Sequence, residues 1–275
     1  MKASGGKHAR GEYRQIAEAG TILRCLVGSG MHGLSIAAQD DRDEMGVCIE
    51  PPEYVIGLRS FDQYIYRTQP EGHRSGPGDL DLTVYSLRKW MRLALAGNPT
   101  ILLPLFTPPE HVIAATPLGH ELRAMQSVIL SRQAGRRFAG YLDAQRRSLL
   151  SRDGKGRDVT RPELIEAYGF DTKFCAHMVR LGLQGVELLE TGQISLPVPE
   201  PERTWLRELR TGKHSMHDAL ARADECERRI KELLETSPLP EKPDYDAAGR
   251  WLVTAYLDSR PWEVASYQRA WEARR

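Results

Sequence analysis

The sequence predicts an α+β fold, in which a small domain built on a mixed sheet precedes an α-helical domain. Three short runs rich in apolar and β-branched residues are typical of strands: 21–27, 45–49 and 79–85. From about residue 107 onward, longer amphipathic segments with helix-start residues follow. The chain is therefore expected to divide into three parts: a mixed domain over 1–110, a helical domain over 111–236, and a proline-rich linker with a C-terminal helical extension over 237–275.

Capping residues set the ends of the expected helices. Ser86 begins a helix that runs to Leu95, and the Gly-Asn-Pro sequence at 97–99 ends it. Asp171 begins a long apolar helix that ends near Gly192. Further helix starts, each with a proline or an acid in the first turn, are expected at Thr107, Thr160 and Ser215.

Composition predicts a globular protein of the cytoplasm. Hydrophobic residues are 41% and charged residues 27% of the 275 residues, and the net charge of +1 leaves any attraction to nucleic acid to a local patch. No apolar run approaches the roughly 20 residues that cross a bilayer, and the polar start of the chain does not resemble a secretory signal. The four scattered cysteines are typical of reduced thiols.

A glycine motif follows the first expected strand. The run Gly28-Ser29-Gly30-Met31-His32-Gly33 matches the G-x-G-x-x-G pattern of dinucleotide-binding folds, and Glu50 ends the next strand. A crossover helix in such a fold needs ten or more residues, whereas only residues 34–39 separate the motif from a cluster of acids. The dinucleotide interpretation is therefore rejected, and a plain glycine turn would leave the acids unexplained.

The acid cluster lies at the start of the second expected strand. Asp41 and Asp43 are two residues apart, so in an extended chain their side chains point to the same side of the sheet. Two such carboxylates can share a pair of Mg²⁺ ions roughly 3.5–4 Å apart, as in two-metal phosphoryl transfer. Asp81, on another strand, supplies a third carboxylate, and Asp79 on the same face is the rival. The competing interpretation is a solvated acidic turn.

These residues resemble the signature of the DNA polymerase beta nucleotidyltransferase superfamily. The resemblance rests on Gly28-Ser29, Gly33 and Asp41-x-Asp43-x-x-Gly46. The sequence is also similar to one branch, the predicted nucleotidyltransferases often encoded beside RNA ligases. That similarity lies in four further stretches: 81–90, 93–101, 173–180 and 187–192.

The resemblance implies a role for each residue of the motif. Gly28 and Ser29 would contact the triphosphate, Asp41 and Asp43 would bind both metal ions, and Asp81 would be the third carboxylate. Residues 1–110 would form the nucleotidyltransferase domain, with Mg²⁺ or Mn²⁺ as cofactor and a nucleoside triphosphate as substrate. The nucleotide would pass to an acceptor, with pyrophosphate leaving, and Asp81 or a metal-bound water would take the proton.

Three functions remain open at this stage. The first is transfer to RNA, for example at a 3′ end during repair. The second is transfer of AMP or UMP to a protein side chain. The third is a catalytically silent module that binds nucleotide or RNA, against which the retention of three mutually repelling acids argues.

Departures from the branch occur at three places. His32 stands where the branch has an aromatic residue, and Asp40 stands where it has serine. The third departure is Leu103-Pro104, in a run where the branch has an acid.

The long helix after Asp171 carries a narrow polar stripe on an otherwise apolar surface. Lys173, His177 and Arg180 begin this stripe, which is expected to line a cleft and to contact the β- and γ-phosphates or the acceptor backbone. The alternative is a solvated face.

A second segment, after the predicted domain boundary, is rich in basic residues. The favoured interpretation of this segment is a solvated helix face, ahead of an RNA contact. Its eight basic residues are Arg132, Arg136, Arg137, Arg146, Arg147, Arg152, Lys155 and Arg157.

Overall fold

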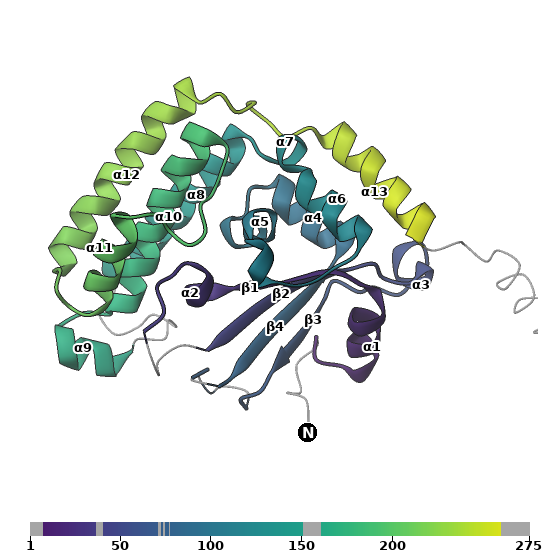
Figure 1. Ribbon diagram of the computed structural model, residues 1–275, viewed down its shortest axis with the longest axis horizontal. Helices are drawn as coiled ribbons and strands as arrows, with labels where there is room; N and C mark the ends of the chain where they lie inside the picture. The colour runs from purple at the N-terminus through teal and green to yellow at the C-terminus, as the bar shows by residue number, and fades with distance from the viewer. Residues whose placement is uncertain are drawn as a thin grey trace, which may run out of the picture.

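A computed structural model describes residues 8–36, 41–70, 73, 75–76, 78–150 and 161–259 of the chain (Figure 1). Several residues named above lie outside this part: Asp40, Arg152, Lys155, Arg157, Thr160 and the end of the expected C-terminal extension from residue 260. Among the described helices, none combines the length and the apolar composition needed to cross a bilayer.

Five strands form one mixed sheet in the order β3-β4-β2-β1-β5. Their bounds are β1 Thr21–Val27, β2 Arg42–Cys48, β3 Gln63–Arg67, β4 Leu80–Ser86 and β5 Val112–Ala115. Strands β2 and β4 run parallel, whereas the other neighbouring pairs are antiparallel. The mixed sheet and its helices confirm the predicted α+β class.

The three strands expected from the sequence are present: the bounds of β1 are as predicted, and the ends of β2 and β4 are shifted by one to three residues. Strand β3 was not expected. The helix expected at Thr107 is wrong, because a single 3-10 turn, Pro109–His111, leads instead into β5. Prolines fix the backbone angle for a turn as well as for a helix start, and the apolar run that follows gains hydrogen bonds by pairing with β1. Strand β5 lies beyond residue 110, and the division into domains there stays a prediction.

Thirteen described segments are helical. In chain order they are α1 Gly11–Gly20, α2 Gly28–Met31, α3 Pro52–Val55, α4 Leu87–Leu95, α5 Pro99–Phe106, α6 Pro117–Ala124, α7 Gln126–Ile129, α8 Arg132–Leu150, α9 Pro162–Tyr168, α10 Thr172–Thr191, α11 Glu202–Arg210, α12 Met216–Thr236 and α13 Tyr245–Ser259.

Helices α4, α5 and α6 cover one face of the sheet, and α1 lies on the other face (Figure 1). The main core fills the space between the sheet and the first group, around the fully buried Trp90 and Leu102. Ser86 caps α4 as expected, since its hydroxyl accepts the Lys89 N–H at 3.2 Å. Asn98 caps α5, a helix that the sequence did not predict.

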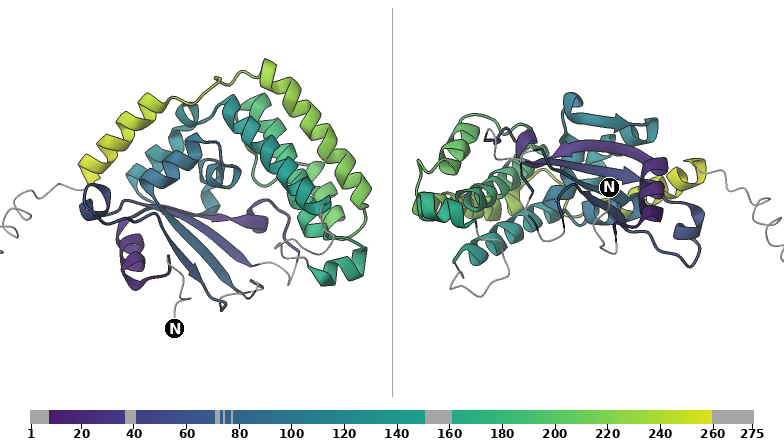
Figure 2. Two further views of the ribbon diagram at one scale, coloured as in Figure 1. Left: turned by 180° about the vertical axis from the view of Figure 1, so that it is seen from behind. Right: turned by 90° about the horizontal axis from the view of Figure 1, so that it is seen from below.

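Helices α8, α10 and α12 pack together beside one end of the sheet (Figures 1 and 2). Asp171 caps α10 by accepting the Phe174 N–H at 2.9 Å, and Gly192 ends this helix with a φ of 69°. Ser215 begins α12 with a capping box. Both predicted ends of α10 and the predicted start of α12 are therefore confirmed. Gly182 in α10 lies against α8 and α12, where an added Cβ would come within 2.7 Å of Leu142 and of Cys226.

Helix α13 packs against the main core through Ala248, Ala255 and Tyr256, and Tyr256 also makes buried hydrogen bonds. The Tyr256 hydroxyl donates to the Glu50 carboxylate at 2.8 Å and accepts the Arg88 N–H at 3.1 Å. Glu50 is only 1% exposed, and this burial raises the pKa of its carboxyl group. Tyr256 therefore donates a side-chain hydrogen bond to a buried acid that follows β2.

Tyr256→Phe should lower the free energy of unfolding by about 1–3 kcal/mol, because it removes a side-chain hydrogen-bond donor from a buried acceptor. Urea unfolding followed by circular dichroism measures this change. Tyr245→Phe is the matched control, since Tyr245 begins the same helix but is 52% exposed. Equal stability of both variants and the wild type would show that the contact does not hold α13.

Candidate active site

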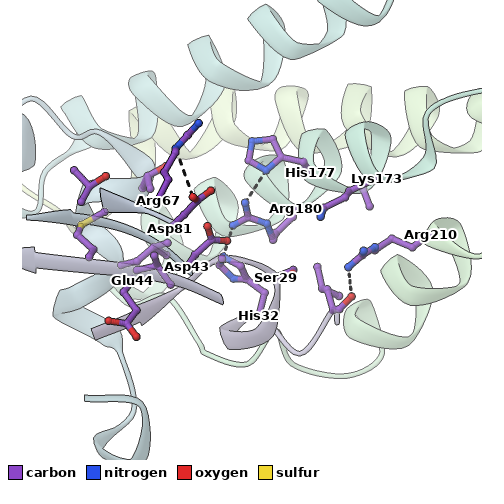
Figure 3. Close-up of a pocket in the computed structure, with 18 of the residues that line it drawn as sticks. Ser29, His32, Asp43, Glu44, Arg67, Asp81, Lys173, His177, Arg180 and Arg210 are labelled. Carbon is purple, nitrogen blue, oxygen red and sulfur yellow. Dashed lines mark hydrogen bonds and ion pairs between the residues drawn. The ribbon is translucent and has the colours of Figure 1, made fainter. Parts of the chain in front are cut away.

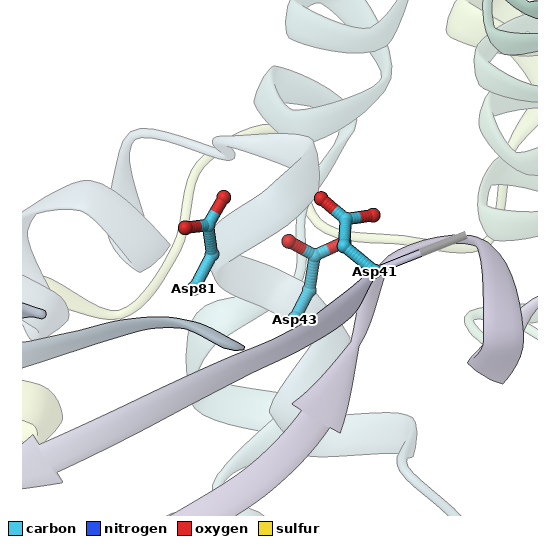
Figure 4. A group of neighbouring side chains, drawn as sticks. All are labelled: Asp41, Asp43 and Asp81. Atoms are coloured by element: carbon cyan, nitrogen blue, oxygen red, sulfur yellow. The ribbon is translucent and has the colours of Figure 1, made fainter. Parts of the chain in front are cut away.

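The parallel pairing of β2 and β4 brings two of the predicted carboxylates side by side. Asp43 and Asp81 are direct partners in the register of these strands. Asp41 lies two residues before Asp43, and its side chain points to the same side (Figure 4). Carboxylate oxygens from all three lie within 4.8 Å of one another, and all three residues are partly buried. The structure thus gathers the three acids that the sequence singled out.

This cluster suits a hard divalent cation. Its three carboxylates offer oxygen ligands within reach of one ion, the ligand type that Mg²⁺ and Mn²⁺ take in proteins. Asp79, the rival for the third position, is engaged elsewhere. Its carboxylate accepts the Gly76 N–H at 2.9 Å and the Thr68 hydroxyl at 2.7 Å, and these bonds lower its pKa. Asp79 therefore stabilises the turn before β4.

The glycine motif lies directly beside the acids. Strand β1 ends at Val27, which pairs with Asp43, and α2 begins at Gly28. Gly28 has a φ of 81°, and an added Cβ would lie 2.1 Å from the Asp43 Oδ2 atom. The position therefore requires glycine for both backbone conformation and space. Ser29 follows Gly28 in α2, so the glycine motif forms a short helix rather than a plain glycine turn.

A cavity of about 400 Å³ lies between the acids and helix α10 (Figure 3). Gly28, Ser29, Asp43 and Asp81 line it, together with a second set from the opposite side: Lys173, His177 and Arg180. The polar stripe of α10 therefore faces a cavity, and the carboxylates face basic groups across it. This volume lies in the range of sites for small ligands.

Arg180 is held by neutral partners. Its Nη1 donates to His32 Nε2 at 2.7 Å and to Gln184 Oε1 at 2.8 Å, and its Nη2 approaches His177 Nδ1 at 2.8 Å. A guanidinium only donates hydrogen bonds, so the ring nitrogens that face it carry no proton. Three of its five N–H groups are thereby used by neutral acceptors.

The electrostatics of this group follow from burial. Burial, and next the charge of Arg180, lower the pKa of His177 to about 3 and hold the pKa of His32 well below its ordinary value. Burial also lowers the pKa of Arg180 to about 10, which still leaves it charged at neutral pH. A desolvated cation with these neutral partners is a favourable contact for an anion in the cavity.

Three residues of the cavity were not assigned a role from the sequence. His32 was only a departure from the family pattern, but it is 2% exposed and contacts Arg180. Arg67 lies on the unexpected strand β3, with its Nε 3.5 Å from Asp81 Oδ1. Arg210 ends α11, is 5% exposed and donates to the Leu34 carbonyl. Only the fold brings Arg67 and Arg210 to the cavity, since no local pattern marks them, whereas His32 lies within the glycine motif.

Asp81 is held by two further donors from the β3–β4 connection. The Gln69 amide donates at 2.9 Å and the Ser75 hydroxyl at 2.6 Å. Leu103, in the run where the resembling branch has an acid, lines the cavity with an apolar side chain. The cavity wall at that point is therefore uncharged.

A nucleotidyltransferase-like protein from Exiguobacterium sibiricum, whose crystal structure was determined at 1.90 Å, aligns with 90% of this chain and 77% of its own. The identity is 10% and the TM-score is 0.29, a value too low to support an inference. No curated protein shows significant sequence similarity to the chain.

A family model gives the decisive match. It is described as the RNA repair pathway DNA polymerase beta family, and residues 7–254 of the chain match it. This range contains the glycine motif, the three acids and the stripe of α10. The protein is thus a nucleotidyltransferase, and it belongs to the RNA repair pathway DNA polymerase beta family.

Proposed function

We propose that the protein uses Mg²⁺ or Mn²⁺ to transfer a nucleoside monophosphate from a nucleoside triphosphate to an RNA acceptor. One observation carries this proposal: a cluster of three carboxylates lies across a cavity from basic groups on α10. Such an arrangement offers a place for cations on one side and for the charge of a triphosphate between the two. The family description, which names an RNA repair pathway, supports RNA as the acceptor.

The residues of the chain would divide the work as follows. Asp41, Asp43 and Asp81 would hold the divalent ions, which when bound supply charge neutralisation at the triphosphate and a lower pKa of the acceptor hydroxyl. Gly28 and Ser29 would contact the triphosphate from the sheet side, and Lys173 and Arg180 from α10. His177 would act by holding Arg180 through its Nδ1 atom.

The reaction itself is a displacement at the α-phosphorus. The acceptor oxygen forms a new bond to phosphorus while the bond to pyrophosphate breaks, and the acceptor proton passes to Asp81 or to water. Gln69 and Ser75 donate hydrogen bonds to Asp81 and fix its orientation. Side chains of the chain form no covalent bond in this scheme. Positioning and charge therefore account for the proposed catalysis.

Removing one carboxylate tests the site. Asp43→Asn and Asp81→Asn should each lower kcat/KM at least about a hundredfold, because a metal contributes several kcal/mol to the transition state and 1.36 kcal/mol is a factor of ten. Asp79→Asn is the matched control and should stay within about threefold, since the Asp79 carboxylate accepts hydrogen bonds from Gly76 and Thr68 in its turn.

The assay uses each α-labelled triphosphate with Mg²⁺ or Mn²⁺, and offers RNA and lysate protein as acceptors. Label on RNA that depends on Asp43 supports the proposal. Label on polypeptide would show that the acceptor is a protein rather than RNA. Triphosphate binding without turnover would indicate a silent module, and transfer that persists in both carboxylate variants would exclude this site.

Arg180→Gln should raise the Kd for a triphosphate at least about tenfold, because a hydrogen bond to a charged group is worth about 1.5–3 kcal/mol. Titration of a fluorescent triphosphate measures this constant. Arg147→Gln is the control, since its side chain is 74% exposed on α8 and pairs with Asp143. An unchanged Kd for Arg180→Gln would place the triphosphate elsewhere.

The pH dependence tests the neutral state of His177. A histidine with an ordinary pKa of 6.5 gains a charge as the pH falls from 7.5 to 5.5, and that charge would strengthen triphosphate binding. The pKa of His177 is about 3, so its ring gains no proton in this window. The ratio of Kd values for His177→Gln and the wild type should therefore stay constant from pH 7.5 to 5.5. A ratio that rises on acidification would contradict this neutral state.

A further inference from the structure

A second cavity lies on the face of the sheet opposite helices α4, α5 and α6. It is a groove of about 1000 Å³, larger than the cavity beside the acids. Residues of α1 and of four strands line it: β1, β3, β4 and β5. In Figure 1 this is the lower face of the sheet, where α1 lies. The groove is thus separated from the candidate active site by the thickness of the sheet.

The groove combines an apolar floor with basic residues. Tyr66, Leu80 and Leu82 contribute apolar surface, whereas Arg14, Arg24 and Arg67 contribute charge. A polyanion whose monomers carry flat apolar faces would match both features. Single-stranded nucleic acid has this chemistry, because its phosphates bind arginine and its bases stack on aromatic side chains.

The charges around the groove leave a positive excess. Arg24 and Arg42 both pair with the single buried acid Glu44. Arg14 pairs with Glu18 on its own helix, and both side chains are more than 60% exposed, so water screens this pair strongly. With Arg67, which pairs with Asp81, these residues number four arginines against three acids.

The groove connects to the candidate active site through Arg67. This residue lines both cavities, and its Nε lies 3.5 Å from the Asp81 carboxylate. It ends strand β3 at the same end of the sheet as Asp43 and Asp81. A strand in the groove would therefore pass Arg67 as its end reaches the acids.

The basic helix α8 offers a less suitable surface. Arg136 pairs with Glu241 at 2.5 Å, and Arg147 pairs with Asp143 at 3.0 Å. Arg146 pairs with both Asp224 and Glu227 of α12. The pairs of Arg136 and Arg146 join α8 to its neighbours, whereas the Arg147–Asp143 pair lies within α8. These pairs support a structural role for the described part of the basic segment.

We propose that the groove binds the acceptor RNA as a single strand. Arg14 and Arg24 bind its phosphates, Tyr66 stacks on a base, and Arg67 binds the phosphate nearest the reacting end. A duplex would hide the base faces that the apolar floor requires. This inference rests on the proposed function only where it directs the end of the RNA toward the carboxylates. Binding of RNA in the groove itself needs neither metal nor triphosphate.

The test measures binding of a fluorescein-labelled 12-nucleotide RNA by anisotropy in EDTA, without triphosphate. Arg14→Glu combined with Arg24→Gln should weaken binding at least tenfold. The plot of log K for RNA binding against log salt concentration should become less steep by about 1.4, at about 0.7 per lost phosphate contact. A 4-thiouridine in the RNA should crosslink to the peptide that contains Tyr66.

Two controls make the result specific. Arg147→Glu on α8 should leave RNA binding unchanged. The groove variant, Arg14→Glu combined with Arg24→Gln, should bind triphosphate as tightly as the wild type. Arg14→Glu alone provides a second variant if Arg24→Gln impairs folding, because Arg14 is exposed and its side chain forms an ion pair with Glu18 of its own helix. Thermal unfolding by circular dichroism monitors the fold of each variant.

Several outcomes overturn the inference. One is RNA binding that the groove variant retains, or that Arg147→Glu abolishes equally. Another is absence of RNA binding together with label transfer to polypeptide that the groove variant reduces, which would assign the groove to a protein. If the groove variant binds RNA normally while Asp43→Asn abolishes transfer to RNA, the proposed function stands and this surface is wrong.

Discussion

The direct pairing of Asp43 with Asp81 across two parallel strands is the constraint on which the site depends. With Asp41 nearby, the three carboxylates repel one another, because one oxygen atom of each lies within 4.8 Å of the other two. Register fixes these positions, so the repulsion remains after folding. Donors from Gln69 and Ser75 offset it at Asp81, and a bound cation would offset it further.

The opposite wall of the cavity carries positive charge, which complements the carboxylates. Arg180 is a desolvated cation held by His32, His177 and Gln184, which are neutral. A carboxylate at those positions would have neutralised the guanidinium. Imidazoles with depressed pKa values orient it and leave its charge available. In the proposed function, the two walls would attract a triphosphate with its metal ions better than either charge alone.

Much of this could be predicted from the sequence where the signal is local. The acids around Asp43, the cap Asp171 and the stripe from Lys173 to Arg180 are encoded within a few residues of one another. Strand β5 was predicted as a helix, because prolines suit both structures and its pairing partner is distant in sequence. Arg67 and Arg210 reach the cavity only through tertiary packing, which no local pattern records.

The central claim is that Asp41, Asp43 and Asp81 share divalent cations beside a triphosphate. The most direct measurement is a crystal structure with Mn²⁺ and a non-hydrolysable triphosphate, in which anomalous scattering locates the metal. The account predicts anomalous peaks between these three carboxylates, with the phosphates extending toward Lys173 and Arg180. Peaks bound elsewhere, or a triphosphate away from this cavity, would contradict it.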